Sequence, residues 1–355
     1  MYICILSMKR YFTLQLLLLL HLLVLSKSHF LLPIVNENGK WGYIDTTGAQ
    51  ILPYQYDLAY HFTDGRALVA VTVNGEYKYS FIDVKGNLYG NWNYTDARPF
   101  SNGYALVRFF SDPLNLSWGF IDTSATLARP LNCLDARSFS SGFAAINKFS
   151  GWGFVNKNFK EVIAAQYSVV GSFSEGLCAV AQGKDTLQRW AYINSLGLQV
   201  IQFKYIYASG FSNHLAAACI EVEEKQMRKT IKRKKVGYLG GNGDFMIPAI
   251  YDEASDFSEG LARVKKDNFE FFIDGMGATV ISLDSGVHAS SFHQGFAAVN
   301  APDGRAYFID THGNIAFDYN FVSLTDFNNG YAFFVKRNGI QGYLDSKGVI
   351  IWKSR

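Results

Sequence analysis

Short apolar runs alternate with turn residues after residue 30, and the same arrangement returns every 34 to 46 residues. A period of this length is typical of repeat architectures, in which each unit is one small supersecondary structure. The clearest anchor is a triplet made of an aromatic residue, an aliphatic residue and a turn residue, usually Asp. Nine copies occur, at 43–45, 81–83, 120–122, 154–156, 192–194, 238–240, 272–274, 308–310 and 343–345.

A second anchor, Phe-x-x-Gly, lies between successive triplets and is followed by a short apolar run. Its Phe residues are Phe62, Phe100, Phe139, Phe173, Phe257, Phe292 and Phe327, and a related copy begins at Phe211. In that related copy His214 replaces the Gly. Runs that are short, rich in aromatic and β-branched residues and bounded by turn residues predict β-strands.

The turn after the triplet has its own pattern. Seven copies place Gly three residues after the last triplet position, which predicts a type I turn closed by a left-handed Gly. Ala125 and Phe159 occupy the Gly position in the other two copies. Because side chains disfavour the left-handed conformation, we expect those two turns to be longer or irregular.

One repeat therefore predicts three or four short antiparallel strands, and no stretch after residue 30 shows a helical period. A unit this small cannot bury its own apolar face, so neighbouring units must stack, with the repeated Phe inserted between them. We expect an all-β fold, a tandem repeat of antiparallel meander units in a propeller-like arrangement. An open solenoid of β-hairpins is the alternative.

Three units carry Trp-Gly next to the triplet, in Lys40-Trp41-Gly42, Trp118-Gly119 and Trp152-Gly153. Over residues 31–355 the chain resembles the WG-repeat (KWG-repeat) proteins. It is a divergent array, because Trp190-Ala191 and Val236-Gly237 replace the pair elsewhere. The resemblance implies an all-β repeat domain of presumed binding function and says little about activity.

The N-terminus differs from the repeats. Lys9 and Arg10 precede an apolar run from Leu16 to Leu25, and small residues follow at 26–28. This order predicts a secretory signal peptide over 1–28 and a repeat domain over 29–355. The run is short for a membrane span, although an uncleaved N-terminal anchor is the alternative. We expect a secreted, periplasmic or cell-surface protein.

Charge adds one irregular segment to this picture. The net charge of +3 is too small to indicate nucleic-acid binding. Seven cations nevertheless cluster between two repeats, at Lys225, Arg228, Lys229, Lys232, Arg233, Lys234 and Lys235. We predict a contact for an anionic partner there, such as an acidic glycan, a phospholipid headgroup or an acidic protein. A solvated hairpin without a partner is the alternative, because charge runs usually lie in water.

Candidate chemistry is otherwise sparse. The seven His residues form no ligand pair, each Asp turn offers a single carboxylate, and no phosphate loop or nucleophile elbow is present. We therefore expect no catalytic residue, no metal and no cofactor. Cys133, Cys178 and Cys219 are expected as buried small residues, with a disulfide between two of them as the alternative.

These observations favour an exported, non-enzymatic binding or scaffold protein that contacts proteins or glycans through a β-repeat surface. The alternative function is an exported glycan-acting enzyme, which would need two carboxylates converging in one cleft. A tether to an anionic membrane through the basic segment is a third hypothesis.

Overall fold

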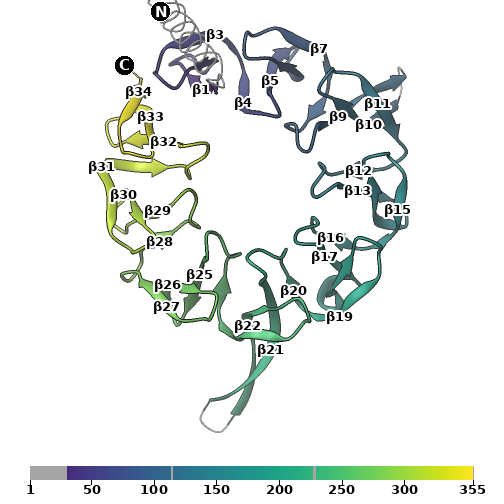
Figure 1. The fold of residues 1–355 in the computed structure, drawn as a ribbon, viewed down its shortest axis with the longest axis vertical. Helices are drawn as coiled ribbons and strands as arrows, with labels where there is room; N and C mark the ends of the chain where they lie inside the picture. The colour runs from purple at the N-terminus through teal and green to yellow at the C-terminus, as the bar shows by residue number, and fades with distance from the viewer. Residues whose placement is uncertain (1–29, 113–114, 227–228, 355) are drawn as a thin grey trace, which may run out of the picture.

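The computed structural model describes residues 30–112, 115–226 and 229–354. Within them the chain forms 34 strands and one short 3-10 turn, η1 (Asp185–Leu187). The strands make nine antiparallel units that follow one another around a ring (Figure 1). The prediction of an all-β, propeller-like tandem repeat is therefore confirmed.

Each unit is a meander with up to four strand positions. First-position strands precede the Phe-x-x-Gly turn: β4 (Leu58–Thr63), β8 (Asp96–Ala97), β12 (Asp135–Ala136), β16 (Val169–Val170), β20 (Tyr207–Ala208), β24 (Glu253–Ala254) and β28 (His288–Ala289). Second-position strands follow that turn or take its place: β1 (Leu32–Val35), β5 (Arg66–Val73), β9 (Tyr104–Asp112), β13 (Phe143–Lys148), β17 (Leu177–Gln182), β21 (Ala216–Gln226), β25 (Leu261–Lys266), β29 (Phe296–Asn300) and β32 (Tyr331–Lys336).

The other two positions lie on either side of the turn that closes the triplet. Third-position strands carry the triplet: β2 (Trp41–Ile44), β6 (Glu76–Ile82), β10 (Asn115–Asp122), β14 (Gly151–Asn156), β18 (Arg189–Asn194), β22 (Lys229–Leu239), β26 (Phe269–Asp274), β30 (Ala306–Asp310) and β33 (Gln341–Asp345). Fourth-position strands complete the units: β3 (Gln50–Tyr56), β7 (Leu88–Tyr94), β11 (Leu127–Leu131), β15 (Glu161–Tyr167), β19 (Gln199–Tyr205), β23 (Phe245–Tyr251), β27 (Thr279–Ser282), β31 (Ile315–Leu324) and β34 (Ile350–Lys353).

Strand order within a unit follows the sequence, as in β12-β13-β14-β15. The first unit has only β1-β2-β3, because the chain enters it at the second position. The eighth and ninth units share one seven-stranded sheet, since β31 pairs with β30 on one side and with β32 on the other. That merging distinguishes this junction from the other junctions of the described chain.

The repeated Phe forms the core between units. Each Phe ring packs on the triplet aromatic of the preceding unit, with ring centroids 4.7–5.2 Å apart in all eight pairs. Phe257, for example, is 2% exposed and lies 4.8 Å from Tyr238. The predicted insertion of Phe between neighbouring units is confirmed, and the core is a chain of small clusters rather than one central mass.

Polar contacts join the same units at the turns between first and second positions, several of which point toward the middle of the ring (Figure 1). In five copies a Ser follows the Phe, and its hydroxyl donates to the carbonyl of the next unit's Phe at 2.6–3.1 Å. Ser258, for example, donates to the carbonyl oxygen of Phe292. The Ser at this position thus has a structural role of its own.

The turns after the triplets have the predicted geometry. The seven Gly residues at this position have φ between 76° and 84°. The expectation of longer or irregular turns at Ala125 and Phe159 was wrong, because both residues adopt left-handed φ, 61° and 57°, in turns of the same length. The side chains of Asp122 and Asn156 accept two backbone N–H groups each, and these bonds hold the turn without Gly.

The first and last units close the ring by packing. Leu32, Ile34 and Ile44 form one buried cluster with Tyr343. The hydroxyl of Tyr343 donates to the carbonyl oxygen of Pro33 at 2.8 Å. Both ends of the described chain lie beside each other (Figure 1), so the arrangement is a closed ring and not an open solenoid.

The predicted signal peptide, residues 1–28, lies outside the described residues. Among the residues that the structure does describe, no helix has the length and apolar character needed to cross a bilayer.

Candidate functional site

The predicted basic segment forms a long hairpin that projects outward from the ring (Figure 1). Its strands, β21 and β22, have 11 residues each, whereas β13 and β14 have six. β20 pairs with β21 only up to Cys219, and β23 pairs with β22 only up to Val236. Beyond those residues the two strands pair only with each other. We call this part, residues 220–226 and 229–235, the arm.

Charges of opposite sign face each other across the arm, with the carboxylates on β21 and most of the cations on β22. Arg233 Nε lies 3.0 Å from Glu224, and Lys232 Nζ lies 3.8 Å from Glu221. These four side chains are 40–66% exposed, so each pair contributes only about 0–1 kcal/mol. The arm is thus a solvated ribbon of opposite charges and not a uniform basic patch.

The seven predicted contact residues have different surroundings. Lys225 and Lys234 form no ion pair with any described residue, whereas Lys232 and Arg233 pair within the arm. Arg228 lies outside the described residues, and the side chain of Lys229 is not described either. Only part of the predicted set is therefore placed on an exposed surface.

Lys235 has a structural contact instead. Its side chain is 9% exposed, and Nζ donates to Asp252 Oδ1 at 2.7 Å. The other oxygen of Asp252 accepts the backbone N–H of Asp267, in the next unit, at 3.0 Å. The hydrogen bond from Lys235 lowers the pKa of Asp252. These three groups join two units, and we call the arrangement the staple.

The same staple joins the first two units. Lys40 Nζ donates to Asp57 Oδ1 at 2.6 Å, and Thr72 N donates to Asp57 Oδ2 at 2.7 Å. Lys40 and Lys235 both stand three residues before the triplet aromatic of their units, Tyr43 and Tyr238. In the sequence, Lys235 stands at the end of the predicted charge cluster. The match between Lys40-Trp-Gly-Tyr and Lys235-Val-Gly-Tyr could have identified it as part of the repeat.

A groove of about 890 Å³ lies beside the base of the arm. Glu224, Arg233 and Lys235 line it from the arm, and Lys266 and Asp267 line it from the next unit. The staple occupies one wall, so the groove combines intramolecular ion pairs with exposed cations. Such a surface can hold a charged chain segment at several points.

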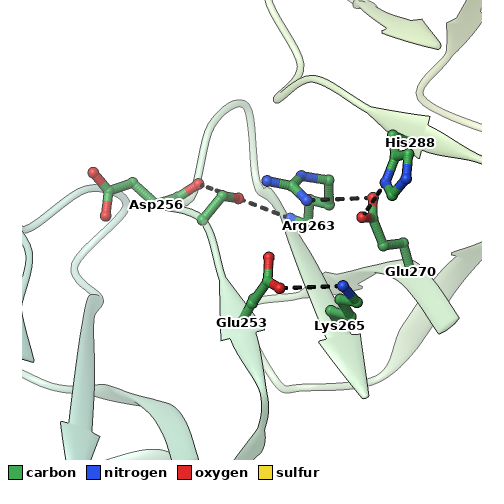
Figure 2. A network of polar contacts seen from close by, with 7 residues as sticks. Glu253, Asp256, Arg263, Lys265, Glu270 and His288 are labelled. Atoms are coloured by element: carbon green, nitrogen blue, oxygen red, sulfur yellow. Dashed lines mark hydrogen bonds and ion pairs between the residues drawn. The ribbon is translucent and has the colours of Figure 1, made fainter. Parts of the chain in front are cut away.

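A second polar cluster lies in the seventh unit (Figure 2). Glu270 stands where other units have Trp, and its side chain is only 4% exposed. Oε1 lies 2.6 Å from His288 Nδ1 in the next unit, and Oε2 lies 3.3 Å from Arg263 Nη1. Burial alone would raise the pKa of Glu270, but the contacts with His288 and Arg263 outweigh it, so this pKa lies below its ordinary value. The cluster adds a polar contact between the two units, beside the Phe292–Phe272 ring packing of the same junction.

Within the ranges that the structure describes, no three His, Cys, Asp or Glu side chains come together to hold a metal ion. The three described cysteines are unpaired. Burial raises the pKa of Cys133 to about 11 and that of Cys178 to about 12, which disfavours the reactive thiolate.

Solved structures similar to this chain include BamB from Moraxella catarrhalis, at 12% identity and a TM-score of 0.47, covering 81% of this chain and 96% of that one. Kluyveromyces lactis Hsv2 matches at 9% identity with a TM-score of 0.38, covering 71% of this chain and 94% of the other. No match was found among curated proteins.

The repeat itself gives the stronger comparison. The pattern described as WG containing repeat matches residues 41–77, 79–109, 118–148, 152–184, 190–221, 237–268 and 308–339. These segments coincide with the strands and turns that form the units of the ring. The chain belongs to the family of WG containing repeat proteins.

Proposed function

We propose that the chain is an exported, non-enzymatic binding and scaffold protein that presents the arm to a protein or glycan at the cell surface. One observation carries this proposal: β21 and β22, with 11 residues each, are the longest strands of the described chain, and their outer parts pair only with each other. Ile220 at the base of the arm packs on a buried cluster, but the rest of the ribbon carries charges on strands outside these clusters, and such a ribbon is suited to recognition. Charged surfaces of this kind set partner choice and association rate more than core stability.

The unpaired cations supply the expected specificity. Lys225 and Lys234 form no ion pair with described residues, and both remain available to an anionic group on the partner. We expect an acidic protein or acidic glycan as the partner. The aromatic side chains that stacking on nucleic-acid bases would require are absent from the described arm.

The carboxylates support the non-enzymatic part of the proposal. Asp83, Asp122 and Asp310 all have a lowered pKa, and each accepts hydrogen bonds from the backbone of its own turn. These carboxylates stabilise the turns of the repeat. A glycan hydrolase needs one carboxyl group with a raised pKa to act as the acid.

Binding through the arm can be tested by trimming it. In one variant an Asn-Gly turn replaces Glu223–Lys232, which keeps Lys235 and its staple. The mature chain from His29 and this variant are compared in a screen against immobilised acidic and neutral glycans and cell-surface proteins. We expect the variant to lose the partner that the intact chain binds. Unchanged binding of every partner would refute the proposal.

A charge-reversal pair separates electrostatics from shape. Lys225→Glu with Lys234→Glu is compared with Lys160→Glu and Lys184→Glu, which make the same change in net charge at exposed sites of other units. Only the arm pair is expected to weaken binding, and the loss should grow at low salt. Equal weakening by both pairs would mean that overall charge, and not the arm, attracts the partner.

A further inference from the structure

The junction between the eighth and ninth units lacks the staple. A staple consists of a cation, a carboxylate and a backbone N–H of the next unit. In the register of the stapled junctions, these three positions hold Arg305, Val322 and Arg337 here. The register is fixed because Phe321 pairs with Ala306, as the corresponding aromatics pair in the stapled units. The cation is kept as Arg, but the carboxylate is replaced by a valine. The acceptor that bridges the units at the two stapled junctions, Asp57 or Asp252, is therefore missing here.

The groups that would meet that carboxylate remain in place. No described residue accepts the backbone N–H of Arg337, whose counterparts at Thr72 and Asp267 donate to the staple. Arg305 Nε contacts Asp303 Oδ2 at 2.6 Å, and Nη1 lies 3.6 Å from Asp318. Asp303 belongs to the turn just before Arg305, and its carbonyl oxygen accepts from Arg337 Nη2 at 3.3 Å. This turn contacts the ninth unit but does not accept the backbone N–H of Arg337.

These groups line a groove of about 670 Å³. Three cations, Arg305, Lys336 and Arg337, face it, and Asp303 is the only carboxylate among its lining residues. Arg305 retains further N–H donors after its contact with Asp303, because a guanidinium has five. The groove therefore has the excess positive charge and directed donors that favour a carboxylate ligand.

The same groove has an aromatic wall. Tyr319 is 42% exposed and lies 5.6 Å from Phe321, edge to face, so its position is held by a buried ring. Asn320 and Asn338 add amide groups at the rim. An exposed ring with amides and guanidinium groups around it suits a sugar, which presents apolar C–H faces and many hydroxyls.

We propose that this groove binds an acidic saccharide. Its carboxylate takes the place that Asp57 and Asp252 occupy at the two stapled junctions, next to Arg337 N–H and Arg305, and its ring lies on Tyr319. The inference rests on the proposed function only in treating the chain as a binding protein. The groove lies two units away from the arm and makes no use of it.

Isothermal titration of the whole mature chain with a galacturonic acid trisaccharide, and with the uncharged galactose trisaccharide, tests the site. The uronate is expected to bind about tenfold more tightly than the neutral sugar, since only it offers a carboxylate to the guanidinium groups.

The informative variant is Val322→Asp, which places a carboxylate at the staple position. It should weaken uronate binding by about tenfold through like-charge occupation of the site, while the protein unfolds at an equal or higher temperature. Val322→Asn is the uncharged control of the same size and should weaken binding less.

Several results would overturn the inference. They are equal binding of both sugars, no effect of Val322→Asp, or binding of a hexaglutamate peptide in place of the uronate. The variant with the trimmed arm should bind the uronate as the intact chain does, and loss of that binding would place the sugar on the arm. The two proposals can fail separately. If the trimmed variant still binds the surface partner, the proposed role of the arm is wrong. If Val322→Asp weakens uronate binding in the same set of experiments, the proposal for the groove is still supported.

Discussion

The joints between units and the arm are built from the same antiparallel strands, yet they differ in almost every other respect. At the joint formed by Phe257 and Tyr238, both side chains are nearly fully buried and pack edge to face. In the arm, the charged pairs are about half exposed, and the strands beyond Ile220 and Lys235 have no further partner. The comparison indicates that the buried joints stabilise the ring, whereas the sequence of the arm can vary without unfolding it.

The largest loss of stability should come from a substitution at a joint between two units. Phe257→Ala removes a buried ring and is expected to cost about 3–5 kcal/mol of unfolding free energy. Denaturant unfolding followed by circular dichroism measures the change. Phe149 offers a matched control, because it is 96% exposed, and Phe149→Ala should change stability by no more than about 0.5 kcal/mol. Similar losses in the two variants would contradict the assignment of the joints as the core.

The staple at Lys235 should have a smaller effect that depends on pH. Lys235→Met breaks the pair with Asp252, whose side chain is 39% exposed, so we expect a loss of about 1 kcal/mol at pH 7. The pKa of Asp252 is lowered in the folded protein by its hydrogen bond from Lys235. The staple therefore stabilises the fold above the unfolded carboxyl pKa of about 3.9, and this contribution is lost as the pH falls through the lower folded value.

Unfolding curves of Lys235→Met and the parent protein should accordingly converge as the pH is lowered below about 4. Lys225→Met removes a cation that has no ion pair among described residues, and its effect should stay within about 0.5 kcal/mol at every pH. A gap between Lys235→Met and the parent that persists in acid would show that the loss reflects packing of the lysine stem and not the ion pair.

Most of the ring could be predicted from the sequence because its determinants are local and repeated nine times. Aromatic triplets, Phe-x-x-Gly turns and left-handed Gly residues each specify a conformation within a few residues, and repetition makes them visible. Ala125 and Phe159 show the limit of this argument. A missing Gly suggested an altered turn, but backbone N–H groups that donate to the side chains of Asp122 and Asn156 preserve the geometry.

The candidate sites were predicted less well, because they depend on register across strands and between units. The cluster of cations in the sequence did not reveal that Lys235 faces Asp252 while Lys232 and Arg233 pair within the arm. Closure of the ring could not be decided either, since the contact of Tyr343 with Pro33 joins the two ends of the chain. The groove near Arg305 emerges only when the units are compared in space.

Hydrogen–deuterium exchange of the intact chain tests the difference between the joints and the arm most directly. Amides of Ile220–Lys225 and Thr230–Lys234 have only each other's strand as partner, so they should exchange much faster than those of Ala216–Ala218 and Leu261–Val264. This result would show that the arm opens independently of a ring that stays closed. Equally slow exchange in the arm and the joints would contradict the account, because it would make the arm part of the ring's cooperative core.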